Sequence, residues 1–251
     1  MFKLLHIDTE TTPLIAYSFT LHEPHLQPEH IIKPSRLLCF SAKWHGEKGM
    51  IFHGDWKESH DNMVRAAHAL LCEADAVCHY NGLSFDIPVL NREFLTLKLS
   101  PPSPSVQIDL FQTVKHKFRM DSSKLAHVAP FLKIGAKVKH QGFDLWRGCM
   151  EGDKKCLALM EKYNKEDTAL VEKLYTAILP WISNHPNVGM HGVLDLTRPA
   201  CPSCGEHALM HQGYRRGTVY TYKRLQCRSC GAWCQERQSI RSAMKPLVKG
   251  I

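Results

Sequence analysis

The sequence lacks any apolar run approaching the ~18 residues that a membrane-spanning helix needs. Its first residues lead directly to Asp8 and Glu10, without the apolar stretch of a secretion signal. These two absences predict a soluble, cytoplasmic protein without a membrane partner. Internal repeats and low-complexity tracts are also missing, which excludes a solenoid and a largely disordered chain. None of the 16 histidines belongs to an H-E-x-x-H pair, so we assign the histidines no metal.

The amino-acid composition is that of an ordinary globular protein. Hydrophobic residues make up 44% and charged residues 22% of 251 positions, which suits one large domain or a medium domain with a small appendage. The net charge of +8 is unevenly distributed, because residues 198–251 hold ten Lys and Arg against two acids. The remaining 197 positions hold 22 basic and 22 acidic residues. Aromatic residues lie among the C-terminal basic ones, and this mixture favours nucleic-acid binding over a solvating tail: Tyr214, Tyr220, Tyr222 and Trp233.

Two C-x-x-C-G motifs, at residues 201–205 and 227–231, stand out among the ten cysteines. Each can offer two thiolates from one tight turn, and four thiolates suit a tetrahedral zinc ion. The glycine that ends each motif permits the positive φ that turns backbone N–H groups towards the sulfurs. We therefore predict one structural zinc ion with no open position for chemistry; spare reduced thiols are the alternative. The predicted ligands are Cys201, Cys204, Cys227 and Cys230. Three nearby residues are alternative zinc ligands, but none of them is needed to complete the site: Cys234, His207 and His211.

Hydrophobic periodicity divides most of the chain into strands and helices. Short apolar runs predict strands at residues 3–8, 37–44, 49–54, 76–80 and 106–109, of which the second and third form a hairpin. Helical spacing predicts helices at residues 61–74, 87–97, 110–118, 123–132 and 153–179. The stretch 133–152 contains glycines and has no clear period, so we expect a surface loop there. Strands that alternate with helices predict an α/β fold, with a mixed sheet flanked by helices.

Four carboxylates and a tyrosine are candidates for chemistry. Asp8 and Glu10 are two residues apart on the first strand, so their side chains leave the same face of the sheet. Asp86 lies at a predicted junction between a strand and a helix, where the role of helix N-cap is the alternative. Asp167 follows Tyr163 by four residues on the long helix, so both occupy one helix face. Burying several acids together is costly unless a cation neutralises them.

In chain order, these residues resemble the three motifs of the DEDD family of 3′→5′ exonucleases. Residues 8–11 (DTET) resemble D-x-E followed by threonine, residues 81–86 (NGLSFD) resemble N-x(2,3)-[FY]-D, and residues 163–167 (YNKED) resemble Y-x(3)-D. Lys162 stands where the histidine subclass has its histidine, so the resemblance is to the tyrosine subclass, DEDDy. The resemblance covers about residues 1–182. More loosely, residues 140–153 and 180–187, followed by a zinc ribbon, resemble uncharacterised ribonuclease H-like proteins of phages and prophages.

The resemblance implies a ribonuclease H-like exonuclease domain at residues 1–185. A linker at 186–199 would join it to a basic zinc ribbon and tail at 200–251. Two catalytic Mg²⁺ or Mn²⁺ ions are implied, with Asp8 bridging them and Tyr163 orienting the attacking water. The implied ligands of these ions are Asp8, Glu10, Asp86 and Asp167. The residues implied to line the pocket for the terminal nucleotide are Thr11, Asn81 and Phe85.

We therefore expect a metal-dependent 3′→5′ exonuclease that hydrolyses single-stranded DNA, with RNA left open as a substrate. The alternatives are a non-catalytic adaptor that binds nucleic acid through the zinc ribbon, and an endonuclease on the same fold. Two basic stretches, 115–119 and 133–140, either guide the nucleic-acid backbone or form ordinary solvated faces. Two further acids, Asp109 and Asp144, are interpreted as structural or supporting residues.

Overall fold

The computed structural model describes residues 2–20, 26–191, 198–218 and 220–240. The chain divides into two compact units, one spanning Lys3–Thr176 and the other combining the first two residues with the chain from Ala177 onward. The domain bounds predicted above stay a prediction. Among the described residues, no helix combines the length and the hydropathy needed to cross a membrane.

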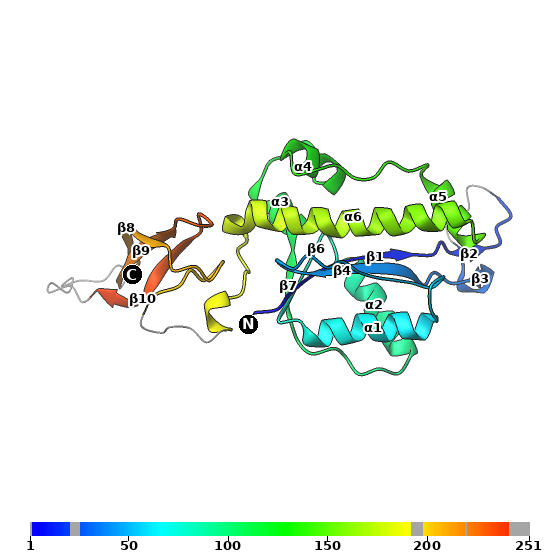
Figure 1. Cartoon of the computed structure of the whole chain (residues 1–251), viewed down its shortest axis with the longest axis horizontal. Coiled ribbons are helices and arrows are strands. Elements are labelled where there is room, and N and C mark those ends of the chain that lie inside the picture. The colour runs from blue at the N-terminus through cyan, green and yellow to red at the C-terminus, as the bar shows by residue number, and fades with distance from the viewer. Residues whose placement is uncertain (1, 21–25, 192–197, 219, 241–251) are drawn as a thin grey trace. The chain divides into compact units, whose positions relative to one another are not determined.

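A five-stranded mixed sheet forms the centre of the Lys3–Thr176 unit (Figure 1). The strand order is β5-β4-β1-β6-β7, in which β4 runs antiparallel to β1 and β5, while β6 runs parallel to β1 and β7. The bounds are β1 Leu4–Thr11, β4 Leu37–Trp44, β5 Ile51–Gly54, β6 Ala76–His79 and β7 Val106–Asp109. Each strand overlaps one that the sequence predicts, because each is a short apolar run bounded by polar or turn residues.

Helices cover both faces of this sheet (Figure 1). Their bounds are α1 His60–Glu73, α2 Asp86–Thr96, α3 Leu110–Lys117, α4 Leu125–Phe131, α5 Phe143–Met150 and α6 Lys154–Ile178. On one face, α1 and α2 pack in a core with Leu5 and Ile7 of β1, both fully buried. Because strand side chains alternate between faces, His6, Asp8 and Glu10 point to the opposite face, which α6 covers.

The structure contradicts the predicted surface loop at residues 133–152, because helix α5 occupies Phe143–Met150. Leu145 of α5 is 2% exposed and packs in a cluster with residues of β4 and α6. Gly148 obscured this helix in the sequence, since glycine disfavours helix interiors. Here glycine is required, because a Cβ at this position would come within 2.3 Å of the Cys156 Sγ atom. Close packing of α5 therefore outweighs the poor helix propensity of glycine.

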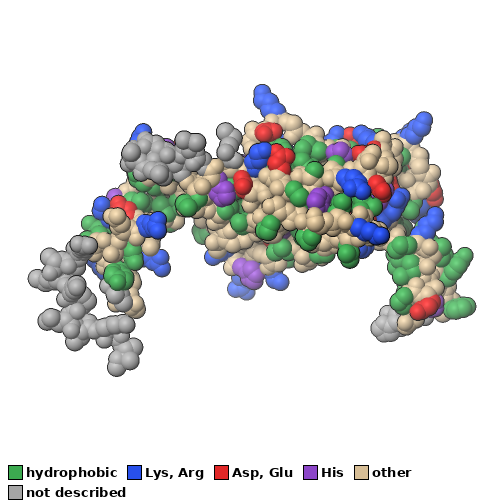
Figure 2. Space-filling model, turned by 90° about the horizontal axis from the view of Figure 1, so that it is seen from below, with side chains coloured by type: hydrophobic (Ala, Val, Ile, Leu, Met, Phe, Trp, Pro, Cys, Tyr) green, Lys and Arg blue, Asp and Glu red, His purple; other side chains and the backbone are tan. Residues whose placement is uncertain are grey.

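A short antiparallel pair, β2 (Ile15–Ala16) and β3 (Ile31–Lys33), is an element that the sequence patterns did not indicate. Its surroundings are apolar but exposed, with Tyr17 at 76% and Phe19 at 95% exposure. Figure 2 shows hydrophobic side chains gathered at the end of the unit that carries these strands. Strands of two and three residues without a buried face carry no hydrophobic periodicity, so the sequence contains no signal for them.

The C-terminal residues form a three-stranded antiparallel sheet in the order β10-β9-β8. Its strands are β8 Leu209–Arg216, β9 Thr221–Cys227 and β10 Trp233–Ile240. We call described residues 198–240 the four-cysteine module. Of the predicted linker at 186–199, residues 192–197 lie outside the described residues, as does the predicted tail from 241 onward.

Candidate active site and metal centres

Three of the predicted acids meet on the α6 face of the sheet. Asp8 and Glu10 extend from β1 and Asp167 extends from α6, and one carboxylate oxygen of each lies within 4.8 Å of the others. Asp167 is 1% exposed, whereas Asp8 and Glu10 are partly exposed. A strand and a helix that are far apart in the chain thus form one cluster of hard oxygen donors.

Asp86 approaches this cluster from the first turn of α2. Its Oδ1 atom accepts hydrogen bonds from the Thr9 backbone N–H at 2.8 Å and from the Thr9 hydroxyl at 2.7 Å. Strand β1 pairs with β6 only over Leu4–His6, so the Thr9 N–H is outside that ladder and free to bind Asp86. Phe85 occupies the N-cap position of α2, so Asp86 is not the helix N-cap. Burial, and next the charge of Asp86, raise the pKa of Asp8.

Asn164 is a residue of this site that the sequence reasoning missed. Its side-chain Nδ2 donates to the Asp8 backbone oxygen at 3.1 Å and to Asp8 Oδ2 at 2.7 Å. Asn164 is fully buried. The Ser41 hydroxyl donates to the Asn164 backbone oxygen at 2.8 Å and lies 2.6 Å from the Thr168 hydroxyl. These bonds hold α6 against β1 and β4. The sequence signal was its place beside Tyr163 in the third motif.

Lys137 places a positive charge beside the acids. Its Nζ donates to Asp167 Oδ2 at 2.5 Å and to the Tyr163 hydroxyl at 3.2 Å, and it lies 5.2 Å from the centre of the Tyr163 ring. The sequence reasoning grouped Lys137 with the basic stretch 133–140 as a guide for nucleic acid or a solvated face. The structure directs this side chain into the carboxylate site instead.

The negative charge of the cluster exceeds what Lys137 supplies. Burial, and next the charge of Asp167, raise the pKa of Glu10 to about 8. The pKa of Asp167 is also raised, because burial outweighs the opposing charge of Lys137. Among the described residues, the buried Oδ1 atom of Asp167 has no hydrogen-bond partner. Oxygen donors, excess negative charge and a free carboxylate oxygen together fit a divalent cation such as Mg²⁺ or Mn²⁺.

Tyr163 lies one helical turn before Asp167 and is 8% exposed. Burial, and next the charge of Asp167, raise the pKa of its phenol well above the ordinary range. The rings of His140 and Trp146 lie 4.9 Å and 6.2 Å from the Tyr163 ring, both edge-on. Tyr163 is therefore a neutral phenol at neutral pH, held in place by aromatic neighbours and able to form hydrogen bonds through its hydroxyl.

The three residues expected to line a nucleotide pocket are less closely tied to the acids. Thr11 ends β1, and Phe85 precedes α2 with 43% exposure. Asn81 has a φ of 65° and donates its backbone N–H to Asp109 Oδ1 at 2.8 Å. Asp109 also accepts the Phe111 N–H at 3.0 Å as the N-cap of α3. In the described part of the chain, no hydrogen bond joins the side chain of Thr11, Asn81 or Phe85 to the four acids.

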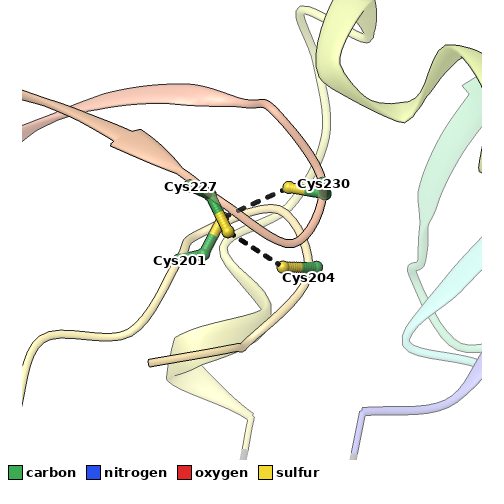
Figure 3. Close-up of side chains that lie close together, drawn as sticks. All are labelled: Cys201, Cys204, Cys227 and Cys230. Atoms are coloured by element: carbon green, nitrogen blue, oxygen red, sulfur yellow. Dashed lines mark hydrogen bonds between the residues drawn. The ribbon is translucent and has the colours of Figure 1, made fainter. Parts of the chain in front are cut away.

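The four predicted zinc ligands lie together in the four-cysteine module and form a second candidate metal centre (Figure 3). The Sγ atoms of Cys201 and Cys230, and those of Cys204 and Cys227, are 3.7 Å apart. A tetrahedral site with Zn–S bonds of about 2.3 Å has S···S edges of about 3.8 Å, so these sulfurs are spaced for zinc. Among the described residues, this group includes none of the three alternative ligands: Cys234, His207 and His211.

The turns that hold these cysteines have the expected backbone geometry. Gly205 and Gly231 have φ angles of 78° and 80°, and each donates its N–H to the carbonyl of the first cysteine of its motif at 2.9 Å. Burial opposes ionisation of Cys227, but the N–H groups of Cys230 and Ser229 outweigh it and lower its pKa to about 7. Burial raises the pKa of Cys204 and of Cys230, so Cys227 is the one of these three thiols that loses its proton most readily.

Comparison with family models matches residues 37–179 to the RNase H superfamily, which is more than half of the sequence. The chain therefore belongs to the RNase H superfamily. This match, together with the mixed sheet and the four-cysteine module, confirms the predicted fold class: a ribonuclease H-like sheet flanked by helices plus a small C-terminal four-cysteine domain.

A search of curated proteins gives no match. Among solved structures, the family B DNA polymerase from the hyperthermophilic archaeon Pyrobaculum calidifontis is similar, with a TM-score of 0.53 and 16% identity. The match covers 72% of this chain and 25% of the polymerase chain. At this identity the likeness shows the fold, and the matched segment is a quarter of the length of the polymerase.

Proposed function

We propose that this protein is a metal-dependent 3′→5′ exonuclease that removes nucleotides from single-stranded DNA. The observation that carries the proposal is the meeting of Asp8, Glu10 and Asp167 on a ribonuclease H-like sheet, with Asp86 hydrogen-bonded to Thr9 beside them. Buried acids at this density are costly for a fold without a function for them. The resemblance of the three motifs to DEDDy exonucleases supports the direction of hydrolysis.

The four acids would hold two Mg²⁺ or Mn²⁺ ions. Such a pair supplies activation of water and neutralisation of charge on the leaving oxygen. Asn164 fixes the rotamer of Asp8 by donating to its Oδ2, and Thr9 fixes that of Asp86 through two hydrogen bonds. These contacts preorganise the carboxylates before substrate arrives.

Tyr163 would orient the attacking water. Because burial raises its pKa, its hydroxyl acts as a hydrogen-bond partner at neutral pH and not as a base. Lys137 donates to this hydroxyl and to Asp167 Oδ2, and its ammonium group would contact the phosphate of the substrate.

The four-cysteine module would bind one structural Zn²⁺ and hold nucleic acid near the catalytic unit. Its exposed aromatic residues support this role, with Tyr214 at 45%, Tyr220 at 58% and Trp233 at 52% exposure. The Arg224 guanidinium lies 4.9 Å from the centre of the Trp233 ring, so a cation and a ring occur together on one strand pair. Stacking surfaces mixed with positive charge bind unpaired bases without sequence preference.

The test is degradation of 5′-labelled single-stranded DNA and RNA by the full chain with Mg²⁺, Mn²⁺ or EDTA. We expect a metal-dependent ladder that shortens from the 3′ end, and loss of turnover by at least about 10³-fold in Asp8→Ala. Asp144→Ala is the matched control, because Asp144 pairs with Arg147 on the exposed surface of α5. Internal fragments would indicate an endonuclease, and a gel shift without products would indicate an adaptor. Full activity of Asp8→Ala would refute the catalytic site.

A further inference from the structure

A second group of metal-ligating side chains lies on the α6 face of the same sheet, apart from the four acids. His6 belongs to β1, His45 follows the end of β4, and Glu172 belongs to α6. One ligand atom of each lies within 4.8 Å of the other two. The three residues are spread over the chain from position 6 to position 172, so no sequence pattern links them.

Hydrogen bonding accounts for only part of this arrangement. The Nδ1 atom of His45 lies 3.2 Å from His6 Nε2 and 3.6 Å from Glu172 Oε1. A single ring nitrogen is either one donor or one acceptor, and 3.6 Å exceeds a normal hydrogen bond. A shared proton accounts for the contact between the two imidazoles, whereas the His45–Glu172 approach is too long for a hydrogen bond and is an ion pair only when His45 is protonated.

A single bound cation would hold the three ligand atoms close together. Zinc bonds of about 2.0–2.2 Å to nitrogen and oxygen give tetrahedral edges of about 3.3–3.6 Å between ligand atoms. The separation of 3.6 Å lies at the upper end of this range, and that of 3.2 Å falls just below its lower end. We propose that His6 Nε2, His45 Nδ1 and Glu172 Oε1 bind one divalent transition-metal ion of the zinc class. Two imidazole ligands favour such an ion over Mg²⁺, which prefers oxygen.

The surroundings hold the three ligands in place. The Lys43 ammonium pairs with Glu172 Oε2, and the Gly46 N–H donates to Oε1 at 3.0 Å, so the carboxylate orientation is fixed while Oε1 keeps a lone pair. The ring of Tyr175 contacts both imidazoles edge-on, at 5.4 Å from His6 and 4.9 Å from His45. The His6 Nδ1 atom has no hydrogen-bond partner among the described residues, so this imidazole is held by its place on β1 and by the Tyr175 ring and not by a hydrogen bond to its second nitrogen.

Access to this site is from the side of His45. The His45 side chain is 39% exposed, whereas His6 is fully buried and Glu172 is 15% exposed. A fourth ligand position can therefore be filled by water from the surface. The ion would join β1, the end of β4 and α6 two residues away from Asp8, and its role would be to pin the helix to the sheet. The proposal does not depend on nuclease activity.

The test is the zinc content of the full chain after equilibration with Zn²⁺ and excess Mg²⁺, measured by mass spectrometry of the metal. We expect His45→Gln and Glu172→Gln each to lose about one zinc equivalent per chain relative to wild type. His53→Gln is the matched control, because His53 also faces a glutamate, at 2.5 Å from Glu58 Oε1. It should retain the wild-type zinc content.

Cobalt substitution separates this site from the four cysteines. Co²⁺ bound to thiolates gives strong sulfur charge-transfer absorption, whereas Co²⁺ on imidazole and carboxylate gives weaker visible bands alone. We expect Cys204→Ser to lose the first signal and His45→Gln to lose the second. Unchanged zinc content and cobalt spectrum in a folded His45→Gln protein would overturn the proposal, and so would an equal zinc loss in His53→Gln.

Discussion

At the residue scale, the carboxylate cluster is governed by its charge balance. Burial raises the pKa of Asp8, Glu10 and Asp167, and the charges of neighbouring acids raise that of Asp8 and Glu10 further, while Lys137 forms a direct ion pair with Asp167. A divalent cation would compete with this ammonium for Asp167 Oδ2. The site therefore couples metal binding, protonation and the position of one lysine.

Replacing Lys137 by methionine removes the positive charge and keeps most of the side-chain volume. We expect the metal-free variant to lose about 1–3 kcal/mol of unfolding free energy at neutral pH, because Asp167 loses its buried partner. Mg²⁺ should stabilise the variant more than it stabilises wild type, because its competitor is gone. Urea unfolding with and without Mg²⁺ measures both effects. Lys139→Met, at an exposed lysine of the same segment, is the control; equal Mg²⁺ effects in all three proteins would contradict the role of Lys137.

The stability of the metal-free protein should also depend on pH through Glu10. Burial and Asp167 raise its pKa from 4.5 to about 8, so between these values the folded state binds more protons than the unfolded state. The contribution of Glu10 is thus fully present below pH 4.5 and is lost as pH rises through about 8. We expect the unfolding free energy to fall across this window, less steeply in Glu10→Gln, and to recover on addition of Mg²⁺. A flat profile in wild type would contradict the raised pKa.

The sequence motifs predicted the four acids and Tyr163 from particular residue types at short spacings, and the structure brings Asp8, Glu10 and Asp167 together. They could not identify Asn164 or Lys137 as parts of the site. Asn164 acts through one side-chain amide that donates to Asp8, and Lys137 reaches Asp167 from a segment without regular structure. Both roles depend on how segments far apart in the chain approach each other.

At the element scale, helix α6 organises the Lys3–Thr176 unit. One face of α6 presents Tyr163, Asn164 and Asp167 to β1, and hydrogen bonds between Ser41 and Thr168 hold it to β4. Helix α5 packs beside it through the close approach at Gly148. The strands of the five-stranded sheet and most helices followed from periodicity, whereas α5 did not, because a glycine in a helix is favoured only by a contact that the sequence does not contain.

Gly148→Ala tests this close approach. Alanine is the better helix former by about 1 kcal/mol, so an exposed helix would gain stability. Here the new Cβ would meet Cys156 Sγ at 2.3 Å and Cys156 Cβ at 2.9 Å, and we expect a net loss of about 1–3 kcal/mol. Chemical denaturation measures the change. Gly49→Ala, where a Cβ meets nothing within 4 Å, should stay within about 0.5 kcal/mol of wild type; a stabilised Gly148→Ala would show that α5 can move away at no cost.

At the scale of the whole molecule, the two compact units depend on different sources of stability. The Lys3–Thr176 unit has an extended apolar core on the α1 and α2 face of its sheet. The four-cysteine module buries a small cluster built around its cysteines and Ala232. The zinc ion proposed for this module would therefore supply a large part of its folding free energy.

Cys204→Ser tests this division. We expect the variant to lose the zinc of the four-cysteine module and to expose residues 198–240 to proteolysis, while the Lys3–Thr176 unit keeps its thermal transition. Metal analysis and limited proteolysis with mass-spectrometric mapping are the measurements. Cys72→Ser, at an exposed cysteine of α1, is the control. Protection of the module in a zinc-free variant would mean that its apolar cluster suffices without metal.

The sequence by itself determined the strands with apolar runs, the periodic helices, the four acids of the exonuclease-like motifs and the paired cysteine turns. These features depend on the spacing of residues along the chain, which can be read from the sequence alone. Only the tertiary structure decided the helix at Phe143–Met150, the contacts of Asn164 and Lys137, and the meeting of His6 with Glu172. Each of these features depends on close contact between segments that are far apart in the chain. Such contacts are set by the packing of the whole sheet and its helices, and no local sequence pattern encodes them.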